Sequence, residues 1–331
     1  MSALLTVKEL EVHFPVASKG LGQVPRTLRA VDGVSLQVAA GETLGIVGES
    51  GCGKTTLGRA ILRLLVPSAG SIHFDGQDIT RASQRQLAPV RKTLQAIFQD
   101  PFGSLNPRLR VRDIVGEPLV NLGWSRERVV ARVNEVLDIV GLPPEYSTRY
   151  PHAFSGGQRQ RIGIARALAP SPRLIVCDEA VSALDVSIQA QILNLLKDVQ
   201  TEFGVAYLFV SHNLAVVRHL SHRVAVMYLG RIVEVSDEPA LFARPLHPYT
   251  AALIAAVPEP DPTRVLGPPA LEGDLPSPLA PPSGCSFRTR CPIATSRCAS
   301  EAPALALHAP GRWVRCHFPG SYQVPSHTET A

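Results

Sequence analysis

A chain of 331 residues with 45% hydrophobic content can bury a large core, which excludes a disordered or low-complexity protein. The formal net charge of +5 at pH 7 comes from scattered basic residues. This distribution favours an ordinary solvated surface over a surface that binds nucleic acid or an anionic membrane. No signal-peptide pattern opens the chain, and no apolar run approaches the roughly 20 residues that cross a bilayer as a helix.

The first elements predicted from the sequence are a strand, a loop, a second strand and a helix. Residues 4–14 (LLTVKELEVHF) favour a strand, and the Gly and Pro content of residues 15–30 favours a surface loop. Residues 41–48 (GETLGIVG) are a short apolar run that ends in glycine and leads into the helical pattern of residues 55–65. Residues 41–65 are therefore predicted to have the order strand, glycine loop, helix.

Helices and strands alternate further along the chain. Apolar residues recur on one helix face between Ser125, a candidate N-cap, and Gly141, and again from Ile188 to Phe203. Three further apolar runs are too short for helices, as expected of buried parallel strands. They are residues 173–179, 205–212 and 222–229.

This alternation predicts an α/β domain with a mostly parallel sheet. We assign it to residues 1–244, with a helical subdomain at about residues 100–170. After residue 245 proline becomes frequent, the apolar periodicity fades and four late cysteines appear. Residues 245–331 are therefore predicted to form a small C-terminal extension.

Residues 48–56 (GESGCGKTT) fit the pattern G-x-x-x-x-G-K-[ST]. The glycines let successive backbone N–H groups point at phosphate oxygens, and the following helix presents its positive end to the same anion. Lys54 would reach the outer phosphates, and the Thr55 hydroxyl would ligate Mg²⁺. A plain glycine-rich turn is the alternative, which the position between a strand and a helix disfavours. The predicted nucleotide-binding residues of this loop are Gly48, Glu49, Ser50, Gly51, Cys52, Gly53, Lys54, Thr55 and Thr56.

Two adjacent carboxylates end the strand predicted at residues 173–179. Asp178 is placed to orient the Mg²⁺, usually through water. Glu179 is a candidate general base for the attacking water, a role worth roughly 10²–10⁴ in rate. A helix-capping acidic pair is the alternative. With the phosphate loop upstream, the pair predicts a nucleotide-hydrolysing enzyme.

A second helix start able to bind an anion lies at residues 155–158 (SGGQ), just before the helical run of residues 159–169. A single domain has no obvious use for two γ-phosphate sites. Two copies facing head to tail would use both, because each could close over the nucleotide held by the other. The residues predicted to act on the partner's nucleotide are Ser155, Gly156, Gly157 and Gln158.

With these motifs the chain resembles the ATPase subunits of ABC transporters over nearly its whole length, which implies an ATPase that uses ATP and Mg²⁺. Phe14 resembles the aromatic residue that stacks on adenine, and Gln99 resembles the residue that links the metal to the membrane partner. Asp185 resembles the residue that touches the other subunit, and His212 the switch histidine that contacts the γ-phosphate. One departure is Phe154, where leucine is commoner in the family.

Other stretches resemble a narrower branch, the oligopeptide and dipeptide importers, and within it the second of two paired ATPases. These stretches are the late cysteines and residues 101–108 (PFGSLNPR), 182–191 (SALDVSIQAQ) and 247–250 (HPYT). The resemblance implies ATP-driven peptide import, with a peripheral place on the cytoplasmic face of the cell membrane. It also implies a heterodimer with a homologous ATPase, two permease subunits and an extracytoplasmic substrate-binding protein. Nickel chelates, glutathione and oligosaccharides are alternative cargoes.

Four cysteines lie in the predicted extension, whereas Cys52 and Cys177 belong to the nucleotide motifs and are expected to pack. A cytosolic address suits a soft metal site in the extension better than a disulfide. The spacing lacks the close pairs that zinc favours, and iron–sulfur clusters accept more varied loops. Zinc and unligated thiols stay open, and the family resemblance favours a four-iron four-sulfur cluster. Its ligands would be Cys285, Cys291, Cys298 and Cys316.

Two other functions are weighed against transport. A soluble ABC-type ATPase acting on nucleic acid would use the basic charge, but the long insertions or second ATPase domain of such proteins are not visible, so no nucleic-acid partner is expected. A catalytically dead regulatory partner is disfavoured because no catalytic motif is degraded.

Overall fold

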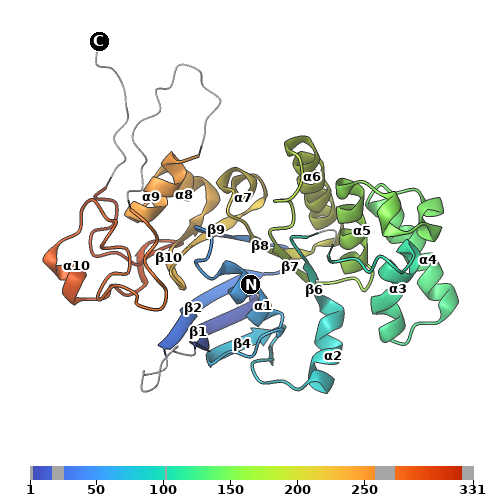
Figure 1. The fold of residues 1–331 in the computed structure, drawn as a ribbon, viewed down its shortest axis with the longest axis horizontal. Helices are drawn as coiled ribbons and strands as arrows, with labels where there is room; N and C mark the ends of the chain where they lie inside the picture. The colour runs from blue at the N-terminus through green and yellow to red at the C-terminus, as the bar shows by residue number, and fades with distance from the viewer. Residues whose placement is uncertain (1–2, 17–25, 101–102, 258–272, 323–331) are drawn as a thin grey trace, which may run out of the picture.

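The structure is a computed structural model that describes residues 3–16, 26–100, 103–257 and 273–322. Its smaller sheet is antiparallel, has the order β2-β1-β4-β5 (Figure 1) and was not predicted as a sheet. A loop was expected at residues 15–30, but residues 15–16 belong to β1 and residues 26–30 to β2, while residues 17–25 lie outside the described residues. The strands of this sheet are β1 (Ala3–Val16), β2 (Arg26–Ala39), β4 (Ala69–Phe74) and β5 (Gln77–Asp78).

The larger sheet has the order β11-β12-β10-β9-β3-β8-β7-β6. Its parallel part contains four predicted strands and one that was not predicted. The four are β7 (Leu174–Asp178), β8 (Ala206–Val210), β3 (Thr43–Val47) and β9 (Arg223–Tyr228), and the additional strand is β6 (Leu94–Ile97). The antiparallel part consists of β10 (Arg231–Asp237), β12 (Arg312–Val314) and β11 (Ala306–Ala309). Every residue of β3, β7 and β8 is buried, because the sheet is covered on both faces.

Successive residues of the central strands alternate between two hydrophobic cores. In β7, Leu174 and Val176 face the core between the two sheets, which also buries α1 (Lys54–Ile61). Ile175 and Cys177 face the opposite core. Its helices include α5 (Gly156–Leu168), α6 (Val186–Phe203), α7 (Leu214–Leu220) and α9 (Pro248–Ala255).

The remaining helices lie around these cores. α3 (Val111–Asn121) and α4 (Arg126–Ile139) join α5 at one end of the molecule, inside the range predicted to be helical (Figure 1). The others are α2 (Gln84–Thr93), α8 (Glu238–Ala243) and α10 (Ser296–Ser300), with short 3₁₀ turns at Pro144–Thr148 and Pro151–Ala153. No helix in the described part of the chain is long and apolar enough to cross a membrane.

α1 ends at Ile61, four residues before the end of its predicted helical pattern, and two details of other helices also differ from expectation. Ser125 is the N-cap residue of α4, but its side chain makes no capping hydrogen bond. Phe203, expected on the buried face of α6, is 43% exposed. That expectation was wrong because Phe203 is the last residue of the helix, directly before the left-handed Gly204.

The C-terminal segment contributes two strands, β11 and β12, to the larger sheet. β12 pairs with β10, opposite Glu234 and Val235. The Glu234 carboxylate is fully buried, and it accepts hydrogen bonds from the backbone N–H groups of Leu246 (2.9 Å) and His247 (2.8 Å). Burial raises the pKa of Glu234, while these two hydrogen bonds lower it. The chain on either side of residue 245 is therefore in close contact, and the domain boundary there stays a prediction.

Candidate nucleotide site

The phosphate loop runs from the end of β3 into α1, as the motif predicts. A Cβ atom on Gly53, whose φ is +108°, would lie 2.0 Å from the Ala30 carbonyl oxygen. One on Gly48 would lie 2.1 Å from the Met227 carbonyl oxygen, so both positions require glycine. Gly53 is also the N-cap of α1 and offers no side-chain cap. The positive end of the helix thus lies directly behind the loop.

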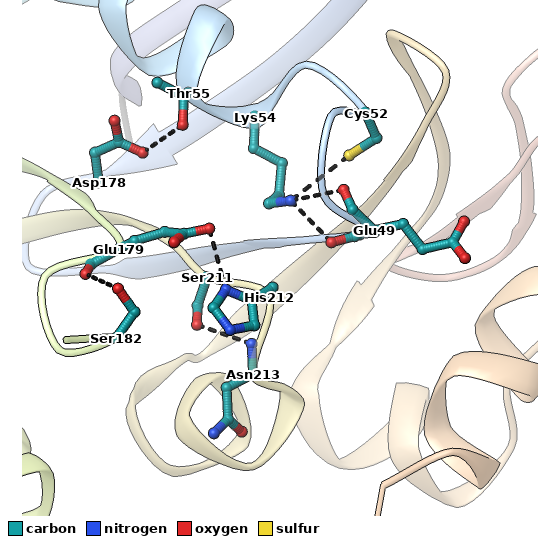
Figure 2. A network of polar contacts seen from close by, with 11 residues as sticks. Glu49, Cys52, Lys54, Thr55, Asp178, Glu179, Ser182, Ser211, His212 and Asn213 are labelled. Atoms are coloured by element: carbon teal, nitrogen blue, oxygen red, sulfur yellow. Dashed lines mark hydrogen bonds and ion pairs between the residues drawn. The ribbon is translucent and has the colours of Figure 1, made fainter. Parts of the chain in front are cut away.

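Lys54 is folded back onto the phosphate loop. Its Nζ atom donates hydrogen bonds to the carbonyl oxygens of Gly48 (2.8 Å) and Glu49 (2.9 Å). It also lies 3.8 Å from Cys52 Sγ, and Figure 2 shows the contacts with Glu49 and Cys52. The side chain is only 4% exposed. A buried ammonium whose partners are two carbonyl oxygens and a cysteine sulfur is strongly attracted to an anion, and a phosphate group in the loop would supply one.

A hydroxyl and a carboxylate meet beside the loop. The Thr55 hydroxyl donates a 2.9 Å hydrogen bond to Oδ1 of Asp178, the last residue of β7 (Figure 2). Burial raises the pKa of Asp178, while the Thr55 hydrogen bond and the positive charge of Arg59 lower it. Hard oxygen donors of this kind are what Mg²⁺ prefers, so the pair fits the predicted metal. Gln99 is exposed and follows β6, the neighbour of β7 in the sheet.

Glu179 and His212 form a second pair at the same edge of the sheet. Glu179 Oε1 lies 3.1 Å from His212 Nδ1, and the two side chains are 15% and 53% exposed (Figure 2). The φ angle of Glu179 is +50°, an unusual value for a residue other than glycine, and such strain costs on the order of 1–3 kcal/mol. Hydrogen bonds from Glu179 N–H to Val210 and from Ser182 to the Glu179 carbonyl hold the strained turn.

All these groups follow the carboxyl ends of parallel strands. Gly48 follows β3, Gln99 follows β6, Glu179 follows β7, and His212 follows β8 by two residues. Because the carboxyl ends of parallel strands lie at one edge, the sheet gathers residues from distant parts of the sequence there. The arrangement holds a phosphate loop, a candidate metal pair and a candidate base beside one another.

Residues 155–158, which are predicted to act on the partner's nucleotide, form a separate region at the start of α5. Ser155 caps α5 in a capping box, in which its hydroxyl accepts from Gln158 N–H (3.3 Å) and the Gln158 side chain accepts from Ser155 N–H (3.1 Å). A Cβ atom on Gly157 would lie 2.6 Å from Ile188 of α6, so the two helix starts are in contact. Asp185, the N-cap of α6, is exposed next to them.

Phe14 lies on β1, opposite Leu28 of β2. Its side chain is half-buried and packs against the core between the two sheets. Cys52 and Cys177 are buried, which confirms that they pack, and burial raises the pKa of both thiols.

Comparison with known proteins agrees with this geometry. Residues 31–182 match the ABC transporter family, and residues 233–298 match the oligopeptide/dipeptide transporter C-terminal region. A probable peptide ABC transporter ATP-binding protein of Sinorhizobium fredii is 54% identical over 95% of this chain and 90% of its own length. The chain belongs to the ABC transporter family. An oligopeptide transport ATP-binding protein of Bacillus subtilis is 51% identical over 95% of this chain and 97% of the relative.

Solved ABC cassettes share the fold. CbiO1 of Clostridium perfringens, part of an ABC transporter complex, has a TM-score of 0.64 at 28% sequence identity. The match spans 73% of this chain and 92% of the CbiO1 chain. A dimeric ATP-binding cassette in a post-hydrolysis state with ADP and Pi has a TM-score of 0.63 at 27% identity, covering 71% of this chain and 98% of its own. The predicted ABC-type α/β fold is thereby confirmed.

In this ABC transporter chain the four late cysteines line one cavity, together with His247 and Phe287. Burial raises the pKa of Cys285, Cys291 and Cys316, the last to about 11. Within the described ranges, however, no group of three or more His, Cys, Asp or Glu side chains is arranged to hold a metal ion. The predicted iron–sulfur cluster is therefore not confirmed and stays a prediction.

Two residues of the same ABC transporter chain hold the phosphate loop without being predicted to do so. The N–H of Glu49 donates one hydrogen bond to the Tyr249 hydroxyl, and the Glu49 carboxylate forms an ion pair with Arg290. Arg290 lies 241 positions away from Glu49 and belongs to no nucleotide motif. Tyr249 was noted only as part of the HPYT stretch, so nothing in the sequence pointed to these contacts.

Proposed function

We propose that this chain is the ATP-hydrolysing subunit of a membrane ABC transporter that imports peptides. The observation that carries the ATPase assignment is the convergence of Lys54, the Thr55–Asp178 pair and the Glu179–His212 pair at one edge of the sheet. The observation that carries the cargo is the 54% and 51% identity to peptide and oligopeptide transport proteins over 95% of the chain.

ATP binding begins at the phosphate loop. Lys54 would exchange the carbonyl oxygens of Gly48 and Glu49 for phosphate oxygens, while the first turn of α1 supplies backbone N–H groups. Phe14 would lie against the adenine ring. Thr55 would hold Mg²⁺ directly, Asp178 would hold it through water and Gln99 would complete its shell. The ion would neutralise charge that builds on the phosphates during transfer.

Hydrolysis requires a base beside the outermost phosphate. The Glu179 carboxylate would polarise the attacking water, and His212, already 3.1 Å from Glu179, would keep that carboxylate oriented and contact the γ-phosphate. The strained turn at Glu179 aims the side chain before ATP arrives, so little reorganisation remains for the reaction.

The remaining assignments concern assembly. Ser155, Gly156, Gly157 and Gln158 would close over the nucleotide of a homologous second ATPase, with Asp185 at the contact. The exposure of Ser155 and Asp185 on adjoining helix starts supports this. Two permease subunits and an extracytoplasmic substrate-binding protein would complete a transporter in which this chain lies at the cytoplasmic face of the membrane. Residues 1–244 would form the ATPase domain and residues 245–331 the extension.

Peptide import gives the first test. In cells lacking the transporter, the complete complex with this chain is expected to restore uptake of labelled dipeptides or oligopeptides in an ATP-dependent way. Uptake of nickel chelates, glutathione or oligosaccharides without peptide uptake would assign the other cargo. Tight, salt-sensitive binding of DNA or RNA by the purified chain would instead favour the nucleic-acid function.

A four-iron four-sulfur cluster held by the late cysteines is the finer part of the proposal. Its support is that four thiols line one cavity, the donor set that such clusters use. Full-length protein purified without oxygen is expected to contain about four iron and four sulfide per chain. Stoichiometric zinc, or no metal in folded protein that binds ATP, would contradict the cluster and leave the ATPase assignment standing.

A further inference from the structure

Every polar group of Glu49 in the phosphate loop is held by another residue. Its carbonyl oxygen accepts from Lys54, and its N–H donates a 2.9 Å hydrogen bond to the Tyr249 hydroxyl. Its carboxylate points away from Lys54 (Figure 2) and accepts two hydrogen bonds from Arg290, at 2.7 and 3.0 Å. A bidentate Arg–carboxylate pair fixes orientation as well as distance. The conformation of Glu49 is thus set from the C-terminal segment.

Arg290 itself is rigidly placed. Its side chain is only 5% exposed, and its backbone N–H donates to the Phe287 carbonyl oxygen. The Phe287 ring is 1% exposed and lies 5.3 Å from the Tyr228 ring and 5.4 Å from the Tyr249 ring, measured between centroids. Tyr228 ends β9, which pairs with β3 just before the phosphate loop. Arg290 and the loop are therefore built on the same core.

Both contacts come from the part of the chain that carries the cysteines. Arg290 lies directly before Cys291, and Tyr249 lies on α9. The Arg290 side chain is 5% exposed and that of Glu49 27%, so water screens this pair less than an ion pair on an open surface. Removal of Arg290 would leave the Glu49 carboxylate uncompensated beside the phosphate loop.

We propose that Arg290 is a positioning residue for ATP binding: through Glu49, the cysteine-rich segment (residues 284–298) holds the phosphate loop in shape and neutralises its carboxylate. This rests on the proposed function, because it assigns a role at the ATP site. Two effects follow from the pair. It restricts the backbone at Glu49, so the neighbouring N–H groups stay aimed at phosphate. It also cancels a negative charge that would repel a triphosphate.

ATP binding to the full-length chain, measured by titration calorimetry with Mg²⁺, tests the inference. Arg290→Gln is expected to weaken ATP affinity about tenfold, which is the loss of about 1.4 kcal/mol. In the assembled transporter the same variant is expected to raise KM more than it lowers kcat, because Arg290 does not touch the reacting atoms. Arg290→Lys keeps the charge but loses the fork and should recover part of the affinity.

A matched control and a double variant separate positioning from general damage. Arg297→Gln removes an exposed ion pair with Glu301 in the same segment and should leave ATP affinity unchanged. Glu49→Gln combined with Arg290→Gln removes the uncompensated carboxylate and should bind ATP better than Arg290→Gln alone. If Arg290→Gln does not fold, Arg290→Lys at an unchanged Tm is compared instead, with a severalfold loss expected.

The outcomes are distinct. ATP affinity of Arg290→Gln or of folded Arg290→Lys within the error of the wild type would overturn the inference, as would an equal loss in Arg297→Gln. A wild-type chain that binds no ATP would contradict the proposed function itself. A wild-type chain that binds ATP, with affinity insensitive to Arg290, would remove only the role of Arg290.

Discussion

Glu179→Gln is expected to bind ATP with near wild-type affinity and to hydrolyse it slower by a factor on the order of 10²–10⁴. The amide keeps the shape and can still lie beside His212, but it cannot accept a proton from the attacking water. The backbone turn that holds residue 179 is fixed by main-chain and Ser182 hydrogen bonds, so the substitution leaves it intact. Single-turnover hydrolysis and equilibrium ATP binding by the assembled ATPases measure the two effects separately.

Glu202→Gln is the control for Glu179→Gln, because it makes the same carboxylate-to-amide change at an exposed residue near the end of α6. It should leave both binding and hydrolysis unchanged. Ordinary turnover in Glu179→Gln would show that Glu179 is not the general base. Loss of ATP binding would show that the carboxylate contributes to binding ATP itself and not only to the hydrolysis step.

Gly53→Ala is expected to abolish productive ATP binding. The added methyl group would lie 2.0 Å from the Ala30 carbonyl oxygen, so the loop or β2 must move. A displacement of about 1 Å in a positioned site costs on the order of a hundredfold. ATP titration of the full-length variant checks the expected loss of affinity.

Gly76→Ala separates this steric effect from backbone strain. Gly76 also has a positive φ, +77°, but nothing lies within 4 Å of an added Cβ, and it follows β4 in the turn before β5. It should lower stability slightly and leave ATP affinity unchanged. A Gly53→Ala chain that binds ATP as well as Gly76→Ala does would contradict the steric argument.

The nucleotide motifs were predictable because each is a local pattern. The run from Thr43 to Thr56 carries its strand, glycine loop and helix in one contiguous stretch, and the apolar run ending at Asp178 is equally local. The antiparallel sheet was not predictable, since pairing of β1 with β4 joins residues some 60 positions apart and local alternation does not name the partner. The Glu49–Arg290 pair was not predictable for the same reason, because its two residues lie 241 positions apart in the sequence.

The cysteines show a different limit. Their spacing and the family resemblance suggested a cluster, but convergence of four sulfur atoms is a property of three-dimensional geometry. The structure brings the cysteines to one cavity and within its described residues gives no ready metal site. Phe203 shows a similar limit within one helix. Periodicity predicts which face of a helix is apolar, but it does not predict where along the helix other elements stop packing against that face.

The pairing of β12 with β10 has a consequence for how the chain is made. Translation delivers the phosphate loop before β10, yet β12 and the arginine that reaches buried Glu234 follow β10 only later in the sequence, with Arg312 78 positions after Glu234. Until then the nascent ATPase carries an open sheet edge and a desolvated carboxylate without its full set of partners. The larger sheet can therefore be completed only after residues 312–314 have been made, well behind the nucleotide motifs.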